Sequence, residues 1–94
     1  MTLFISYDFT NDRTRSKFSK FLTKYGRRIQ YSVYEITNSQ RYRDKVMAEI
    51  ESKYRPMFED TDSVWVWEMT DNDAETRIHK YGYAEGENRS VVFL

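Results

Sequence analysis

The pattern of apolar and polar positions predicts a strand near the N-terminus. Residues 3–8 form an apolar, aromatic-rich run of strand length that ends in the carboxylate of Asp8, and the turn-forming residues 10–12 follow. We expect this run to be a central strand that places Asp8 at one end of a sheet.

The following residues repeat with helical rather than strand spacing. Asn11 or Asp12 can cap a helix that runs over about residues 12–25, and Gly26 is a helix-ending residue. The apolar face of this helix would consist of Phe18, Phe21, Leu22 and Tyr25. The spacing therefore predicts an amphipathic helix packed against the sheet.

Residues 28–36 alternate between the two sides of an extended chain. The spacing predicts one long strand with one buried face. One side carries Ile29, Tyr31 and Val33, and the other carries Gln30, Ser32 and Tyr34.

A second helix is predicted over about residues 39–55. Residues 37–39 supply its cap, and Pro56 prevents its continuation. Apolar residues recur every fourth position at Tyr42, Val46, Ile50 and Tyr54. The pairs Glu49–Lys53 and Glu51–Arg55 have the spacing of surface ion pairs, which stabilise a helix by only a few tenths of a kcal/mol.

The last clear strand, residues 63–69, contains both tryptophans. Trp65 and Trp67 share one face, and Val64 and Val66 share the other. Two tryptophans can stack on bases, but nothing basic surrounds them in the sequence, so we expect them to pack beneath a helix. Residues 70–76 are predicted to form a loop, and residues 78–82 and 90–94 short strands.

This order of elements favours an α+β fold, a ferredoxin-like βαββαβ two-layer sandwich with an extra C-terminal strand. We expect residues 1–82 to form the domain and residues 83–94 a tail and strand used in dimer or partner contact. Eight tyrosines in 94 residues also favour a homodimer, because tyrosine is common at protein interfaces.

Charge is distributed unevenly, although the formal net charge is zero. The chain as far as residue 56 has a net charge of +6 and the remainder −6. These halves either neutralise each other in the fold or form one basic and one acidic face. Residues 13–34 contain seven cations and no acid, which suits the phosphates of a nucleic acid. On the first helix Arg13, Lys17, Lys20 and Lys24 lie within about 60° of one another.

Several classes of function are excluded or disfavoured by residue content. No cysteine is present, which excludes disulfides, thiolate metal sites and thiol nucleophiles. None of the three glycines belongs to a phosphate-binding glycine loop. No apolar run approaches the ~20 residues that span a bilayer. We therefore expect a cytoplasmic protein that does not associate with membranes.

Asp8 is the candidate catalytic and metal-binding residue. An aspartate after a strand is either a turn-former or a ligand, and Mg²⁺ needs only one or two protein carboxylates besides water and phosphate. A twofold axis near Asp8 would supply the second carboxylate. His79, the single histidine, is either a general base or a surface residue, and we favour the latter because it stands alone in an acidic segment.

Two sequence stretches carry a resemblance to a known family. The run Ile5-Ser6-Tyr7-Asp8-Phe9 with the arginine-rich residues 11–18 after it, and the run from Tyr25 to Glu35 that contains Gln-Tyr-Ser-Val-Tyr-Glu, resemble the CRISPR-associated Cas2 family. The resemblance implies a ferredoxin-like homodimer in which two Asp8 carboxylates bind one Mg²⁺ or Mn²⁺. It also implies a metal-dependent endonuclease or endoribonuclease that hydrolyses double-stranded DNA or RNA, including single-stranded RNA.

The same resemblance implies partners and binding residues. In this family the dimer bridges integrase subunits and holds a DNA duplex during spacer acquisition in prokaryotic cells. The family's positions near the site or the nucleic acid match Tyr7, Arg13, Arg15, Arg28 and Tyr34, and the basic stretch adds Lys17, Lys20 and Arg27.

Two departures from the family pattern are Phe9, in place of an aliphatic residue, and Thr14, which interrupts an arginine pair. An alternative function stays open: a ferredoxin-like regulatory module that binds a small ligand at a dimer interface.

Overall fold

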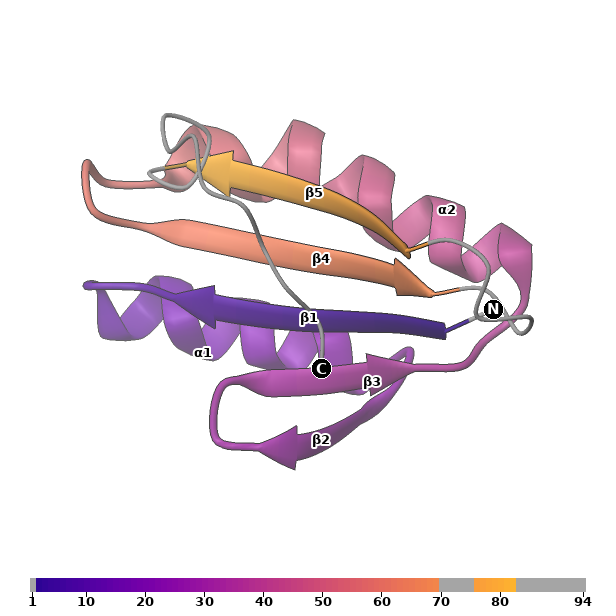
Figure 1. The fold of residues 1–94 in the computed structure, drawn as a ribbon. Coiled ribbons are helices and arrows are strands. Elements are labelled where there is room, and N and C mark those ends of the chain that lie inside the picture. The colour runs from indigo at the N-terminus through magenta and orange to yellow at the C-terminus, as the bar shows by residue number, and fades with distance from the viewer. Residues whose placement is uncertain (1, 70–75, 83–94) are drawn as a thin grey trace.

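The computed structural model describes residues 2–69 and 76–82, which form one sheet and two main helices (Figure 1). In chain order the elements are β1 (Thr2–Asp8), α1 (Asp12–Thr23), β2 (Arg27–Gln30), β3 (Val33–Ile36), α2 (Gln40–Glu49), the π-helical turn η1 (Ile50–Tyr54), the 3₁₀ turn η2 (Arg55–Met57), β4 (Ser63–Met69) and β5 (Thr76–Gly82). None of the helices in these ranges is long and apolar enough to cross a membrane.

The five strands are antiparallel and lie in the order β2-β3-β1-β4-β5. The first four strands with α1 and α2 give the βαββαβ arrangement, so the predicted ferredoxin-like fold is confirmed. β1 is the central strand, as expected, and its last residue Asp8 pairs with Ser63 of β4. The fifth strand is β5, which is longer than predicted, whereas the strand expected at residues 90–94 and the tail 83–94 lie outside the described residues.

The single long strand predicted over residues 28–36 is wrong, because the chain turns back at Tyr31 and Ser32 to form the β2–β3 hairpin. The register of this hairpin shifts between Arg28 and Gln30. The backbone N–H of Tyr7 donates to the carbonyl of Ser32 over 3.2 Å. The turn is thereby held beside the end of β1, close to Asp8.

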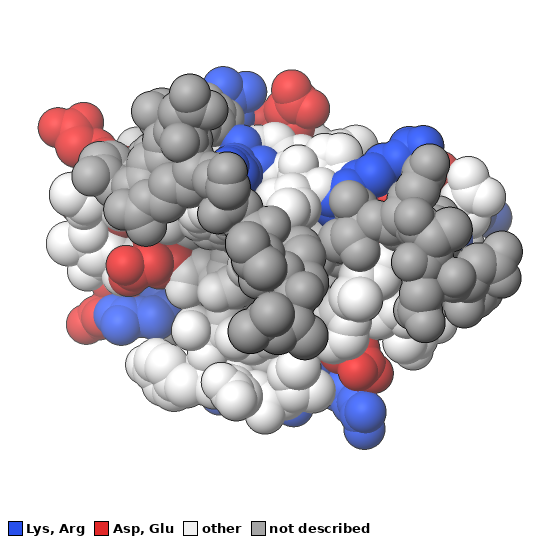
Figure 2. Space-filling view, viewed as in Figure 1, with Lys and Arg blue, Asp and Glu red and all other residues white. Residues whose placement is uncertain are grey.

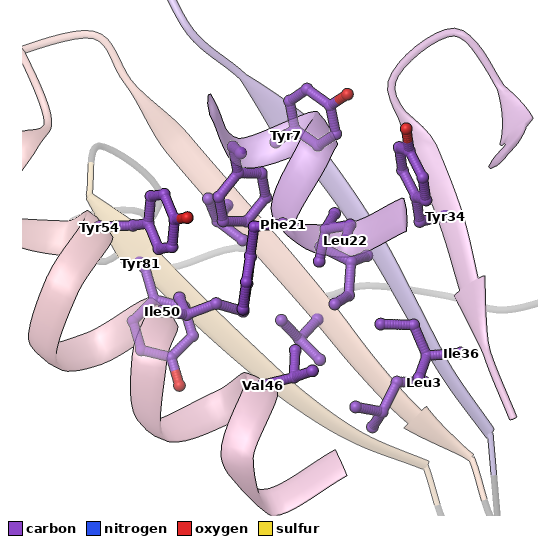
Figure 3. Packing of buried hydrophobic residues seen from close by; sticks show 14 of the residues in the cluster. Leu3, Tyr7, Phe21, Leu22, Tyr34, Ile36, Val46, Ile50, Tyr54 and Tyr81 are labelled. Carbon is purple, nitrogen blue, oxygen red and sulfur yellow. The ribbon is translucent and has the colours of Figure 1, made fainter. Parts of the chain in front are cut away.

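Both helices cover the same face of the sheet (Figure 1), and the core lies between the two layers (Figure 3). Phe18 of α1 is at its centre, with ring centroids 5.1 Å from Tyr7, Phe9 and Tyr54. Aromatic pairs of this geometry each contribute about 0.5–1.5 kcal/mol beyond the area that they bury. The odd-numbered residues of β1 supply this core, so its even-numbered residues, Asp8 included, lie on the opposite face.

The predicted second helix has about the expected length, but only its first part is an α-helix. α2 ends at Glu49, and the chain continues through η1 and η2 before Phe58. Of the two predicted ion pairs, Glu51–Arg55 is present at 3.8 Å. Among the described residues Glu49 and Lys53 do not form the other pair, and the Lys53 ammonium lies 5.5 Å from the ring centroid of Tyr54 instead.

The expectation that the tryptophans pack beneath a helix is wrong. Val64 and Val66 face the helices and are fully buried, whereas Trp65 and Trp67 lie half-buried on the other face of β4. We call this second side of the sheet the open face, because no helix among the described residues covers it (Figure 1). Where Figure 2 leaves this face visible, Lys, Arg, Asp and Glu side chains lie mostly around the outline of the molecule.

A buried carboxylate connects two loops at the Asp8 end of the sheet. Asp62 is fully buried, and its two oxygens accept hydrogen bonds from the backbone N–H groups of Thr10 and Glu59, at 2.9 and 2.8 Å. Gly82, with a φ of +72°, lies so close that a Cβ there would be 2.3 Å from the Asp62 carbonyl oxygen. Glycine is therefore required at this contact.

Candidate functional site

Asp8 is an exposed carboxylate at the end of the central strand, on the open face. Backbone pairing on both sides fixes the strand that carries it, because β1 is bonded to β3 and to β4. Within the described residues no hydrogen bond or ion pair engages its carboxylate oxygens. Asp8 therefore has the free lone pairs that a metal ligand requires.

A depression of about 450 Å³ surrounds Asp8. We call it the carboxylate depression, and its lining comprises Ser6, Tyr7, Asp8, Phe9, Arg15, Tyr31, Ser32, Ser63 and Trp65. Its lining side chains thus include one acid, one guanidinium and several hydroxyls. Such a set can bind a hydrated cation through Asp8 and an anion through Arg15.

A second depression of about 440 Å³ shares Tyr7, Arg15 and Tyr31 with the first. We call it the arginine pocket, and its lining comprises Tyr7, Asp12, Arg15, Ser16, Ser19, Lys20, Arg28 and Tyr31. Arg15 forms an ion pair with Asp12, which neutralises part of the charge. Three cations against one acid still leave the pocket positive, as an anion-binding site requires.

The side chain of Arg28 is held in this pocket by hydroxyl groups. Its guanidinium donates to Tyr34 Oη over 3.2 Å and to Ser19 Oγ over 2.7 Å, and these two hydroxyls lie 2.7 Å apart. Thr23 Oγ1 lies 3.2 Å from the same Tyr34 oxygen. Figure 3 shows the hydroxyls of Tyr7 and Tyr34 pointing to one side, away from the aliphatic residues of the core.

These contacts change the pKa values of Tyr34 and Arg28. Burial by itself raises the pKa of Tyr34, but hydrogen bonds to its neighbours and the positive charge of Arg28 outweigh it, so the pKa lies below 10.0. The hydrogen bond to Tyr34 is the main reason that the pKa of Arg28 is raised above its ordinary value. Burial raises the pKa of Tyr7, whose phenol therefore stays neutral at physiological pH.

Comparison with known proteins identifies the family. A family model described as CRISPR associated protein Cas2 matches residues 1–77, which include all of β1 to β4. The chain belongs to the Cas2 family. Membership implies a role in CRISPR adaptation, and the predicted resemblance is confirmed.

Two curated Cas2 relatives are named endoribonucleases. CRISPR-associated endoribonuclease Cas2 2 of Methanospirillum hungatei is 28% identical over 90 residues, which cover 96% of each chain. CRISPR-associated endoribonuclease Cas2 3 of Synechocystis sp. is 50% identical over 36 residues, and this match spans 38% of our chain and only 39% of that protein. These names support nuclease activity at the level of the Cas2 family.

A solved structure supports the fold independently. The crystal structure of a hypothetical protein, TT1823 from Thermus thermophilus, matches with a TM-score of 0.50 and 20% sequence identity. The match covers 99% of this Cas2 chain and 90% of that one. At this identity the likeness concerns the arrangement of strands and helices.

The structure brings together four of the binding residues predicted for this Cas2 chain and separates the others. Tyr7, Arg15, Lys20 and Arg28 line the arginine pocket. Tyr34 reaches it through its hydroxyl, because its ring is buried in the core.

The other predicted cations lie outside the arginine pocket. Arg27 lies away from it, in an ion pair of 3.3 Å with Glu35. Arg13 is exposed at the start of α1, and Lys17 lines a different depression.

Sequence reasoning missed the hydroxyl residues that organise the pocket. Ser19 and Thr23 lie on α1 four and eight residues after Arg15, so they share one helix face with it. This spacing could have indicated them. Tyr31 could not be placed from the sequence, because its position depends on the hairpin turn that the alternation concealed.

Within the described residues no group of three or more His, Asp or Glu side chains lies close enough together to bind a metal ion. Among the described residues, no second acidic or histidine ligand therefore joins Asp8 in such a cluster. His79 does not supply one, because it pairs with Val66 of β4 and so lies on the helix-covered face, where its Nε2 is 3.2 Å from Glu68 Oε2.

Proposed function

We propose that this chain acts in CRISPR adaptation as a homodimer that binds duplex nucleic acid and bridges integrase subunits. In this proposal paired Asp8 residues bind Mg²⁺ or Mn²⁺ and hydrolyse phosphodiester bonds of DNA or RNA. The observation that carries the proposal is the free Asp8 carboxylate on the open face, next to a pocket with three cations. Family membership gives the CRISPR context.

The open face supports association with a second copy. Phe4 of β1 and Trp65 of β4 lie on this face, and they present half-buried aromatic surface that none of the described helices covers. Two such faces can pack about 10 Å apart, as sheets do in sandwiches. Because Asp8 lies on this same face, a twofold axis close to it would bring the two carboxylates together.

The residues present fit a divalent cation shared by two chains. Two Asp8 carboxylates are the oxygen ligands that Mg²⁺ prefers, with its other positions left to water and phosphate. The bound ion would polarise the scissile phosphate and lower the pKa of a water molecule. Arg15, at the boundary of both depressions, would bind a phosphate oxygen and stabilise the charge that develops on it.

In this proposal the remaining cations bind the duplex. Arg28 is held by the hydroxyls of Ser19 and Tyr34, so little of its side-chain freedom is lost when it contacts a phosphate. Lys20 lines the same pocket, and the exposed Arg13 and Lys17 extend the positive surface along α1. Contacts to phosphates give affinity without base specificity.

Asp8→Asn tests the catalytic part of the proposal. Cleavage of duplex DNA or RNA in Mg²⁺ should fall about a hundredfold or more, since loss of one group that stabilises transition-state charge costs on that order. Asp44→Asn, which removes an exposed carboxylate from α2, is the matched control and should cleave normally. Binding to the duplex should survive in both variants, and undiminished cleavage by Asp8→Asn would place the activity elsewhere.

A further inference from the structure

A third depression lies on the helix side of the molecule, between α1 and η1. It has a volume of about 260 Å³, and we call it the lysine groove. Its lining comprises Lys17, Lys20, Phe21, Lys24, Lys53, Tyr54 and Met57. Four of these residues are cations and none is an acid, so the groove is positively charged throughout.

Two structural features gather these lysines. Lys17, Lys20 and Lys24 lie three or four residues apart on or just after α1, which places them on one helix face. Lys53 comes from η1, and no ion pair to Glu49 or to any other described acid engages it. Its ammonium lies over the ring of Tyr54 instead, on the wall of the groove.

The four ammonium groups are uncompensated within the described residues. All four lysines are exposed, and none of them forms an ion pair with a described side chain. An ordinary helix surface mixes charges of both signs, since like charges at this spacing are destabilising. A cluster of one sign therefore favours an anionic ligand that touches several positions at once.

The groove is continuous with the arginine pocket, because Lys20 lines both. A positive track thus runs from Arg28 and Arg15 across α1 to Lys53. From Lys17 to Lys24 the helix rises by about 10 Å, which corresponds to about three nucleotides along one strand of a duplex.

We propose that the lysine groove is a second phosphate-binding site, which holds the backbone of the same duplex beyond the arginine pocket. This inference rests on the proposed function, and it states where on the protein the duplex continues beyond the arginine pocket. The rings of Phe21 and Tyr54 are buried, so the groove offers no platform for bases. Lysine is a flexible point charge without the planar fork of arginine. The groove therefore adds affinity that does not depend on sequence.

The test measures how affinity for duplex DNA falls with salt. Each phosphate contact contributes about 0.9 to the slope of log K against log salt. The double variant Lys24→Gln/Lys53→Gln should lower this slope by about 2, since two contacts are lost. Asp8-dependent cleavage of saturating substrate should be unchanged, because neither lysine lines the carboxylate depression.

The matched control is Arg41→Gln/Lys45→Gln, which removes two exposed cations of α2 that do not line the groove. It should leave the slope nearly unchanged. An equal reduction in both double variants would mean that net charge alone matters, and it would overturn the assignment. An unchanged slope of log K against log salt in the groove variant would overturn it as well. The same holds if the groove variant keeps its affinity for duplex DNA but no longer binds the integrase.

The same titration separates this inference from the proposed function. Arg15→Gln/Arg28→Gln should also lower the affinity and the slope. If that variant loses binding while the groove variant does not, the proposed function stands and the lysine groove is refuted. If the unmodified protein does not bind duplex DNA even at low salt, both fail, and a small ligand at a dimer interface becomes the better account.

Discussion

At the scale of single residues, hydroxyl groups determine how the cations of the site are presented. Arg28 is exposed, yet Ser19 and Tyr34 hold its guanidinium from the side of the core. Arg27, its neighbour in sequence, is instead neutralised by Glu35. Two adjacent arginines therefore differ in their surroundings, because the hairpin places different partners beside each of them.

Titration of the tyrosines tests this arrangement. Tyr34 should ionise at a lower pH than an ordinary tyrosine, because its pKa is lowered. In an ultraviolet pH titration, Tyr34→Phe should lose the earliest phenolate signal, and Arg28→Gln should shift that signal to higher pH, since a positive charge beside the phenolate is removed. Inorganic phosphate bound at Arg28 should raise this pKa in the unmodified protein. An unchanged titration in Arg28→Gln would contradict the described contact.

At the scale of elements, the connections around the site are fixed by side chains rather than by repeating backbone bonds. Asp62 joins the loop between β1 and α1 to the loop before β4 through its two backbone hydrogen bonds. In addition, the hydroxyls of Thr10 and Thr61 lie 2.8 Å apart. The loop that follows Asp8 is therefore held even though it is short and exposed.

Asp62→Asn should lower the free energy of unfolding by about 2 kcal/mol, because one buried N–H would face an amide group in place of a carboxylate oxygen. Urea unfolding followed by tryptophan fluorescence, at one fixed protein concentration, measures the change. Asp60→Asn, at an exposed position two residues earlier, should change stability by less than about 0.5 kcal/mol. Equal stability of the two variants would show that the buried hydrogen bonds contribute little.

The elements were predictable from sequence where local signals agreed with each other. The start of α1 at the Asn11 cap is an example, because the Asn11 side chain accepts from the backbone N–H groups of Arg13 and Thr14. The β2–β3 hairpin was missed because its turn residues, Tyr31 and Ser32, continue the alternation and include no glycine.

The position of the tryptophans was missed for a different reason. Alternation separates the two faces of a strand but does not say which face meets the helices. Val64 and Val66 meet them here. The position of Asp8 was predicted correctly, whereas the hydroxyl network depends on contacts between elements that a single sequence does not reveal.

At the scale of the whole molecule, the two sides of the sheet differ in the side chains that they carry. The helix-covered side contains the core and carries the cations of α1 on its outer surface. The open face carries aromatic residues together with Asp8. In the proposed function the open face meets a second copy, while the cations bind nucleic acid, so neither contact competes with the other.

Phe4→Lys tests the role of the open face. A charge on the central strand should raise the dissociation constant of the dimer at least about a hundredfold, or 2.7 kcal/mol, because hot-spot residues contribute on that scale. Sedimentation velocity over a range of concentrations measures the change. Tyr42→Lys, which alters an exposed aromatic residue on α2, should leave the dimer intact. A folded, monomeric Phe4→Lys protein that still cleaves in Mg²⁺ would refute catalysis by paired Asp8 residues.

The central place of β1 has a consequence for how such a molecule can diversify. Asp8 is anchored by neighbours on both flanks, whereas β2 and β5 form the outer margins of the sheet. Amino-acid replacements at those margins can alter the surface of the protein and leave the backbone that carries Asp8 in place. The chemistry proposed for Asp8 then does not depend on the outer strands, so the two can be engineered independently.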